Sequence, residues 1–283
     1  MKHLFTLCLL AFLMLCSLNS TAQATSETKA KAADNNKNTN AVAPHNISMQ
    51  GAYAMVRQIA NDGTKDSLTG TEQLKIYTDR YLMYAHPIAG DSLADYGIGT
   101  YEIRDNKVIE YIFHTASGGA QKDTFELRID KTADGYTQVF DIPEYLGRKW
   151  TVREEYKSVG KAVATPLDGA WKQTKSQYIT KDGNTITNNN PTQYKVYQSG
   201  YFIWANTVAD SITNKPVSYY GYGTFAMDGN NRSTEVNTSS SYKTALVGQP
   251  VSLQLEFMGK DAYQQTILGT SGDRSIEVYQ RLK

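Results

Sequence analysis

The sequence repeats itself once at a spacing of about 120 residues, far above the ~20–50 residues of a solenoid unit. The segment Gly51–Tyr53 recurs as Gly169–Trp171, and Leu74–Tyr77 recurs as Tyr194–Tyr197. Two further matches keep the same order: Tyr81–Ala85 with Tyr201–Ala205, and Tyr96–Tyr101 with Tyr220–Phe225. Each copy has about 115 residues, the size of an independent domain. We therefore predict two tandem domains, at residues 46–160 and 166–283.

Within a copy, apolar side chains alternate at a period of two. Ile109, Tyr111 and Phe113 are separated by single residues, a pattern typical of a strand with one apolar face. Clusters of Gly, Asn and Asp interrupt such runs at short intervals, as at Asn61–Gly63 and Ala133–Gly135. The runs between them number about eight per copy, which indicates an antiparallel meander. We therefore predict an all-β protein without helices.

A Gly-x-Gly pair lies inside one predicted strand of each copy, at Gly97–Gly99 and at Gly221–Gly223. Residues two apart on a strand face the same side of the sheet. The missing side chains permit the sharp coiling that a closed barrel needs, and closure removes unpaired sheet edges. The alternative is a sandwich in which an aromatic ring packs against the glycines. We favour two tandem antiparallel meander β-barrels.

The N-terminus is typical of a secretory signal peptide. Residues 1–24 combine a basic start, an apolar run from Leu4 to Leu18 and a small-residue pattern that places cleavage after Ala24. The run is shorter than the ~20 residues of a membrane span, so we expect no transmembrane segment. Residues 25–45 are rich in Lys, Ala and Asn, and are predicted to form a flexible leader.

Both cysteines, Cys8 and Cys16, lie inside the apolar run. The mature chain therefore contains no disulfide and no thiolate metal site. Lipid attachment at Cys16 is the less favoured alternative, because Leu15 precedes it where lipoprotein processing prefers a small residue. We expect an exported protein, either periplasmic or secreted.

The charge balance argues against nucleic-acid binding. The chain has 29 Lys and Arg against 28 Asp and Glu, and removal of the signal peptide, whose only charged side chain is Lys2, leaves no net charge. A basic footprint for nucleic acid is therefore missing. The 20 tyrosines outnumber the 8 Phe and 3 Trp, which favours strands. The 40% hydrophobic content excludes a disordered chain.

The Gly-x-aromatic motifs at Gly51–Tyr53 and Gly169–Trp171 resemble the Gly-x-Trp signature of lipocalins and the wider calycin group, with Tyr replacing Trp in the first copy. Over both copies the chain resembles secreted bacterial lipocalin-like proteins of unknown function. The resemblance implies a small molecule bound inside a cup, with no catalytic set. It also implies that the Trp closes the barrel base against an Arg of the last strand, for which Arg153 and Arg281 are candidates.

Candidate catalytic residues are sparse. A nucleophile would need a histidine base and an orienting acid, but His45 lies in the leader, His86 aligns with Asn206, and His114 has no histidine counterpart. Glu110 and His114 share a strand face at positions i and i+4, about 13 Å apart, too far for one metal ion. We expect no enzymatic activity, no cofactor and no metal.

Aromatic rings on alternating strands are expected to line the barrels and offer a pocket with a few polar groups. The candidate ligand-binding residues are Tyr84, Tyr101, Tyr111 and Glu110 in the first copy, and Trp204, Tyr222 and Glu235 in the second. The glutamates have an alternative interpretation as solvated surface charges. We expect the ligand to be a small, partly apolar molecule, lipid-like or a glycan. The alternative function is an interaction module that presents loops 89–96 and 209–220 to an envelope protein or a glycan.

Overall fold

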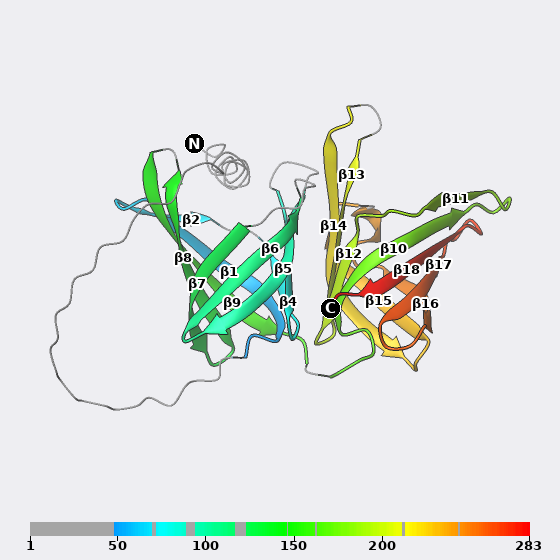
Figure 1. The fold of residues 1–283 in the computed structure, drawn as a ribbon, viewed down its shortest axis with the longest axis horizontal. Helices are drawn as coiled ribbons and strands as arrows, with labels where there is room; N and C mark the ends of the chain where they lie inside the picture. The colour runs from blue at the N-terminus through cyan, green and yellow to red at the C-terminus, as the bar shows by residue number, and fades with distance from the viewer. Residues whose placement is uncertain are drawn as a thin grey trace, which may run out of the picture. The chain divides into compact units, whose positions relative to one another are not determined.

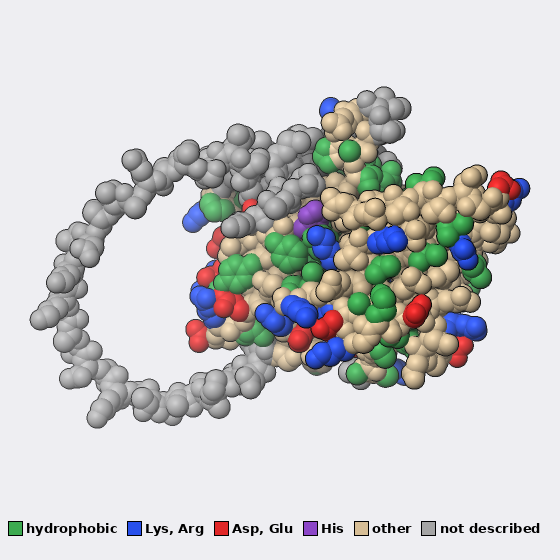
Figure 2. Space-filling view, turned by 45° about the vertical axis from the view of Figure 1, so that its right-hand side comes forward, with side chains coloured by type: hydrophobic (Ala, Val, Ile, Leu, Met, Phe, Trp, Pro, Cys, Tyr) green, Lys and Arg blue, Asp and Glu red, His purple; other side chains and the backbone are tan. Residues whose placement is uncertain are grey.

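The structure is a computed structural model that describes residues 48–283 except for 70–71, 89–93, 117–122, 146, 162, 211–212 and 243. The predicted signal peptide and leader, with Cys16, lie outside the described residues. Figure 1 shows two sheets, each curved round onto itself. On the face shown in Figure 2, basic and acidic side chains lie interspersed. In the part of the chain that the structure describes, no helix has the length and apolarity needed to cross a membrane.

The first sheet has nine strands, and eight of them close into an antiparallel barrel, with the short second strand paired to the first alone. Its strands are β1 (Gly51–Asn61), β2 (Asp66–Thr69), β3 (Leu74–Tyr77), β4 (Tyr81–Pro87), β5 (Ala94–Arg104), β6 (Lys107–Thr115), β7 (Asp123–Thr132), β8 (Gly135–Tyr145) and β9 (Arg148–Val159). β1 pairs with β3, each strand from β3 to β8 pairs with the next one, and β9 returns to pair with β1 along Ala52–Asn61. The short strand β2 and β3 share the other edge of β1.

The second sheet repeats this order and closes in the same way. Its elements are β10 (Gly169–Ile179), β11 (Thr185–Asn188), β12 (Tyr194–Gln198), β13 (Tyr201–Ala209), β14 (Pro216–Asp228), β15 (Arg232–Ser240), the 3-10 helix η1 (Thr244–Leu246), β16 (Pro250–Phe257), β17 (Ala262–Leu268) and β18 (Arg274–Arg281). The pairing of β10 with β18 closes the barrel. The prediction of two tandem antiparallel barrels is confirmed.

The Gly-x-Gly pairs lie where each barrel bends. Register shifts interrupt the β5–β6 pairing next to Gly99 and the β14–β15 pairing next to Gly223. At each bulge the glycine lets a backbone carbonyl of the neighbouring strand approach, because a Cβ on Gly99 would lie 2.2 Å from the Tyr111 oxygen. An aromatic ring also packs against the other glycine, Tyr84 on Gly97 and Trp204 on Gly221. The aromatic packing that the alternative invoked is therefore present, but in a closed barrel, and the sandwich prediction is wrong.

The outer faces of the two barrels meet in one apolar cluster, within the single unit formed by Met49–Lys283. Its buried members are Ala52, Leu74, Ile76, Tyr81, Met83, Ala85, Tyr96 and Ile98 from the first barrel, and Ala170, Val196, Ile203, Ala205, Tyr220 and Tyr222 from the second. Polar contacts accompany it: the Tyr96 and Thr207 hydroxyls lie 2.7 Å apart, and the Tyr81 hydroxyl donates to the Lys283 carbonyl at 2.5 Å. We call these residues the shared face.

Separate expression of residues 46–160 and 166–283 should give two folded barrels that self-associate. The strand pairing closes within each half, whereas the shared face becomes exposed to water, and apolar patches of that kind drive association. Circular dichroism with multi-angle light scattering tests this. The matched control replaces Met83 and Ile98 with Lys in the first half, which should restore a monomer. A half that lacks β-structure would contradict the expectation that each barrel closes alone.

Candidate functional site

Strand alternation assigns every side chain of β3 and β4 to the shared face or to the barrel interior. Leu74 and Ile76 belong to the shared face. Lys75 and Tyr77, which alternate with them along β3, therefore point into the first barrel. By the same rule Lys195 and Tyr197 point into the second barrel. We call the interior the lumen, the end where β1 and β10 begin its base, and the end where β4 passes to β5, or β13 to β14, its loop end.

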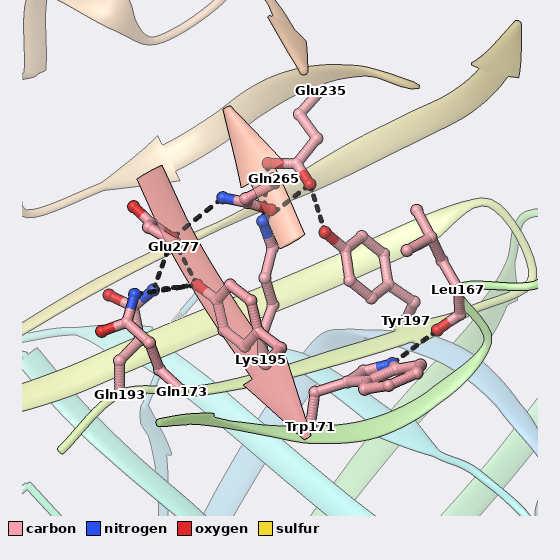
Figure 3. Close-up of polar contacts among 10 residues, drawn as sticks. Leu167, Trp171, Gln173, Gln193, Lys195, Tyr197, Glu235, Gln265 and Glu277 are labelled. Atoms are coloured by element: carbon pink, nitrogen blue, oxygen red, sulfur yellow. Dashed lines mark hydrogen bonds and ion pairs between the residues drawn. The ribbon is translucent and has the colours of Figure 1, made fainter. Parts of the chain in front are cut away.

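A buried ion pair lies inside each lumen at the same repeat position. The Lys195 ammonium lies 2.7 Å and 3.0 Å from the two carboxylate oxygens of Glu235, and the Tyr197 hydroxyl donates to Glu235 at 2.6 Å. Figure 3 shows both side chains pointing toward Glu235. In the first barrel Lys75 lies 2.7 Å from Glu110, to which Tyr77 also donates. Both glutamates face the lumen, which excludes their interpretation as solvated surface charges.

A second carboxylate in each lumen is held by neutral donors. Glu154 accepts hydrogen bonds from Gln58 at 2.7 Å, Gln138 at 2.6 Å and Tyr156 at 2.8 Å. In the second barrel Glu277 accepts from Gln265 at 2.9 Å, as Figure 3 shows, and from Tyr279 at 2.5 Å. Gln73 and Gln193 donate to the hydroxyls of Tyr156 and Tyr279, respectively.

This duplicated network keeps its tyrosines protonated. Burial, and then the charge of Glu110, raises the pKa of Tyr77 well above its ordinary value, and burial with the charge of Glu235 does the same for Tyr197. Each hydroxyl is therefore a hydrogen-bond donor at neutral pH. A buried network with paired charges specifies side-chain positions inside the lumen.

Aromatic rings fill the base of each lumen. Trp171 is fully buried, donates its indole N–H to the Leu167 carbonyl at 2.7 Å and carries the Arg281 guanidinium 4.0 Å above its ring centre. Of the two arginine candidates, Arg281 therefore contacts the tryptophan. Arg153 is wrong as a partner, because its side chain is 55% exposed and reaches Glu155. In the first barrel Lys131 lies 5.5 Å above Tyr53 instead.

At the loop end, Tyr84 and Trp204 occupy equivalent places. Tyr84 pairs with Lys75 across β3–β4, and Trp204 pairs with Lys195 across β12–β13. Each ring lies over a glycine of the next strand, so both face the lumen as the sequence predicted. Beyond Tyr84, His86 and Asp95 form a buried pair, with Nε2 of the imidazole 3.0 Å from Oδ2 of the carboxylate.

His86 is held at both ring nitrogens. Its Nδ1 lies 3.1 Å from the Pro87 carbonyl, and Nε2 contacts Asp95. Burial lowers the pKa of His86, but the hydrogen bond and charge of Asp95 outweigh burial and raise the pKa overall. Because both ring nitrogens donate best when the ring is protonated, the geometry and the direction of the pKa change agree.

Stability should therefore fall as the pH rises above about 6.5, the ordinary histidine value. Because the pKa of His86 is higher in the folded than in the unfolded state, protonation of His86 stabilises the fold at low pH, and this stabilisation is lost as the pH rises through the folded-state pKa. Each unit of pKa increase on folding corresponds to ~1.4 kcal/mol in the free energy of unfolding. Urea unfolding of the wild type and of His86→Gln at pH 6 and pH 8.5 measures it. The variant should lose this pH dependence. His114, whose pKa burial and Lys172 lower, is present in both proteins, so an unchanged pH dependence would contradict the assignment.

The loop end of the second barrel carries neutral groups where the first carries His86 and Asp95. Asn206 stands opposite Tyr219 in the pairing of β13 with β14. The rings of Trp204 and Tyr219 both contact Tyr242, with centroids 6.2 Å and 5.5 Å away. The side-chain oxygens of Asn206 and Asn237 are buried and have no hydrogen-bond partner among the described residues.

Three predicted orientations are wrong. Tyr111 is 37% exposed on the outer face and donates to Glu102, because its neighbour Glu110 occupies the inward position. Tyr222, between the two inward glycines, belongs to the shared face. His114 does not share a face with Glu110, because the bulge at Gly99 inverts the alternation; its Nε2 lies 3.1 Å from the Tyr96 hydroxyl on the shared face.

Tyr101 does face the lumen, but at the base. Its ring lies 4.9 Å from that of Tyr77, and its hydroxyl donates to the Thr78 carbonyl at 2.7 Å. It therefore closes the base and lies away from Tyr84. Among the described residues, no three His, Asp or Glu side chains are placed to hold a metal ion.

Sequence reasoning missed the residues that neutralise the glutamates. Lys75 and Lys195 lie inside the match of Leu74–Tyr77 with Tyr194–Tyr197. The second carboxylates were also missed: Glu154 and Glu277 each lie two residues before a tyrosine near the end of their copy, Tyr156 and Tyr279. Completing the alignment of the copies position by position would have identified them.

No family model and no curated protein matches the chain. Among solved structures, a redesigned β-barrel aligns over its whole length with 44% of this chain, at 15% identity and a TM-score of 0.27. A protein of unknown function from the DUF3598 family of Nostoc punctiforme aligns over 96% of its length with 83% of this chain, at 11% identity and a TM-score of 0.25. The barrel assignment rests on the strand pairing and not on these likenesses.

Proposed function

We propose that this chain is an exported lipocalin-like protein that binds a small, partly apolar molecule at the loop end of at least one lumen and catalyses no reaction. The observation that carries the proposal is the set of buried acceptor oxygens without partners beside an aromatic ring: Asp95 beside Tyr84, and Asn206 and Asn237 near Trp204. Buried polar atoms are almost always hydrogen-bonded, so unmet acceptors call for an explanation. A ligand that donates hydrogen bonds and stacks an apolar part on the ring supplies one.

The same geometry supports a binding role over catalysis. A histidine that acts as a general base needs a free ring nitrogen within reach of a substrate proton. Both nitrogens of His86 are engaged by the protein, and His114 contacts Tyr96 on the shared face. Glu110 and Glu235 are each occupied by a lysine and a tyrosine. The second carboxylates, Glu154 and Glu277, accept hydrogen bonds from neutral side chains.

Native mass spectrometry of the purified full chain, followed by fluorescence titration with extracted lipids and soluble sugars, tests the proposal. A bound species should change the emission of the wild type, and this change should disappear in Trp204→Phe if the second lumen is occupied or weaken in Tyr84→Leu if the first is. The fully buried Trp171 remains in both variants as an internal reference. Binding that survives both substitutions would instead favour the loops, and with them the interaction module.

A further inference from the structure

Asp95 holds a buried oxygen with no partner in the described chain. Its side chain is 8% exposed, and only Oδ2 is engaged, by His86. Oδ1 is buried and accepts no hydrogen bond, although a carboxylate oxygen can accept two. Because the next residue, Tyr96, belongs to the shared face, Asp95 points into the first lumen. Asp95 and Tyr84 therefore face the same lumen from the neighbouring strands β5 and β4.

The surroundings of Tyr84 are acidic. Burial raises the pKa of the Tyr84 hydroxyl well above its ordinary value, and the charges of Asp95, Glu110, Asp123 and Glu154 raise it further, in that order. Of these carboxylates, Glu110 is neutralised by Lys75. Glu154 is held by Gln58, Gln138 and Tyr156, all uncharged donors. The first lumen thus holds more carboxylates than paired cations among the described residues.

We propose that the first barrel binds the ammonium group of an aliphatic amine at Asp95 Oδ1, with the apolar part of the amine beside Tyr84. The inference deepens the proposed function and rests on it. An ammonium group supplies the missing donor and also the positive charge, and charge interactions are strong in a low-dielectric interior. A hydroxyl group would supply the donor alone, and a carboxylate would be repelled.

The second barrel is an internal comparison. Asn206 and Tyr219 replace His86 and Asp95 at the equivalent positions, so its loop end has acceptor oxygens but no carboxylate there. The duplication has produced two lumens with the same buried ion pair and different loop ends. An amine should therefore bind once per chain, in the first barrel.

Calorimetric titration of the full chain with n-hexylammonium, n-hexanol and hexanoate tests the proposal. We expect one hexylammonium per chain, bound at least tenfold more tightly than hexanol, and no binding of hexanoate. Asp95→Asn keeps the shape and an acceptor oxygen but removes the charge, so it should reduce the preference for the ammonium over the alcohol to less than twofold. Asn206→Ala, the matched change in the second barrel, should leave the preference intact.

His86→Gln should have the opposite effect on hexylammonium affinity, and it tests the proposal if Asp95→Asn does not fold. Removing the imidazole leaves Asp95 without its protein cation, so hexylammonium should bind several-fold more tightly. Equal binding of the amine and the alcohol to the wild type, or an unchanged preference in Asp95→Asn, overturns the amine proposal while leaving a lumen binder. The absence of any bound molecule in native mass spectrometry, with no response to lipids, sugars or these probes, overturns the proposed function itself.

Discussion

Replacing Lys195 with Met is expected to lower the free energy of unfolding by about 3–5 kcal/mol, because it leaves the buried Glu235 carboxylate without its ammonium partner. Tyr197 remains as a donor at 2.6 Å, but a single neutral hydroxyl cannot replace two charge-assisted contacts. Lys75→Met should have a similar effect on the first barrel through Glu110. Urea unfolding followed by circular dichroism measures both variants.

The double variant Lys195→Met with Glu235→Leu distinguishes the cost of leaving one charge unpaired from the net contribution of the ion pair to the free energy of unfolding. An apolar replacement of a buried ion pair is often neutral or stabilising, so the double variant should recover most of the stability that the single variant loses. Lys107→Met is the surface control: its pair with Glu126 is about half exposed, and its loss should cost ~1 kcal/mol or less. A double variant as unstable as the single one would contradict the assignment of the cost to an unpaired charge.

The fold could be predicted because its signals are local and occur twice. Alternation at a period of two identified strands in both copies, and the Gly-x-Gly pairs marked the positions where each sheet bends. The burial of the shared face could also be predicted from the sequence. The runs Leu74–Tyr77 and Tyr81–Ala85 contain few polar residues, and strands buried on both faces have this composition.

The candidate site was predicted less well, because face assignment depends on parity along each strand. Tyr111 and Glu110 are adjacent, so only one of them can point inward. Tyr222 lies between two glycines that share one face of the strand, so it must point to the opposite side of the sheet. The orientation of His114 could not be obtained in this way, since one extra residue at a bulge inverts all later positions on its strand. The Gly-x-Gly pair marked the bend, but not that the extra residue, Phe113, lies on β6.

The pairing of Asp95 with His86 was beyond the sequence for another reason. Its two members lie on consecutive strands whose register depends on the length of the connecting loop, and His86 has Asn206 as its counterpart in the second copy. Comparison of the copies finds what duplication preserved, such as Glu110 and Glu235. The same comparison cannot identify residues that occur in the first barrel alone, such as the pair of His86 and Asp95.

Alanine substitutions at the two glycines of each Gly-x-Gly pair are expected to reduce stability by different amounts. A Cβ on Gly99 would lie 2.2 Å from the Tyr111 carbonyl oxygen and 2.8 Å from the Ile112 Cα, both backbone atoms, whereas the atoms nearest to a Cβ on Gly97 belong to the Tyr84 side chain, the first at 2.6 Å. Backbone at a bulge cannot move aside without breaking strand pairing. We therefore expect Gly99→Ala to cost about 3 kcal/mol or more and Gly97→Ala about 1–3 kcal/mol.

A double-mutant cycle with Tyr84→Leu distinguishes the two causes. The smaller side chain should reduce the cost of Gly97→Ala to less than about 1 kcal/mol and leave the cost of Gly99→Ala unchanged. If Tyr84→Leu relieves both substitutions equally, the bulge does not constrain Gly99. The second barrel must show the same order, because a Cβ on Gly221 would meet side chains, Asn237 and Trp204, each at 2.5 Å, while a Cβ on Gly223 would lie 1.9 Å from the Val236 carbonyl oxygen. The ring positions that the proposed ligand would contact thus depend on one glycine of each pair, and barrel closure depends on the other.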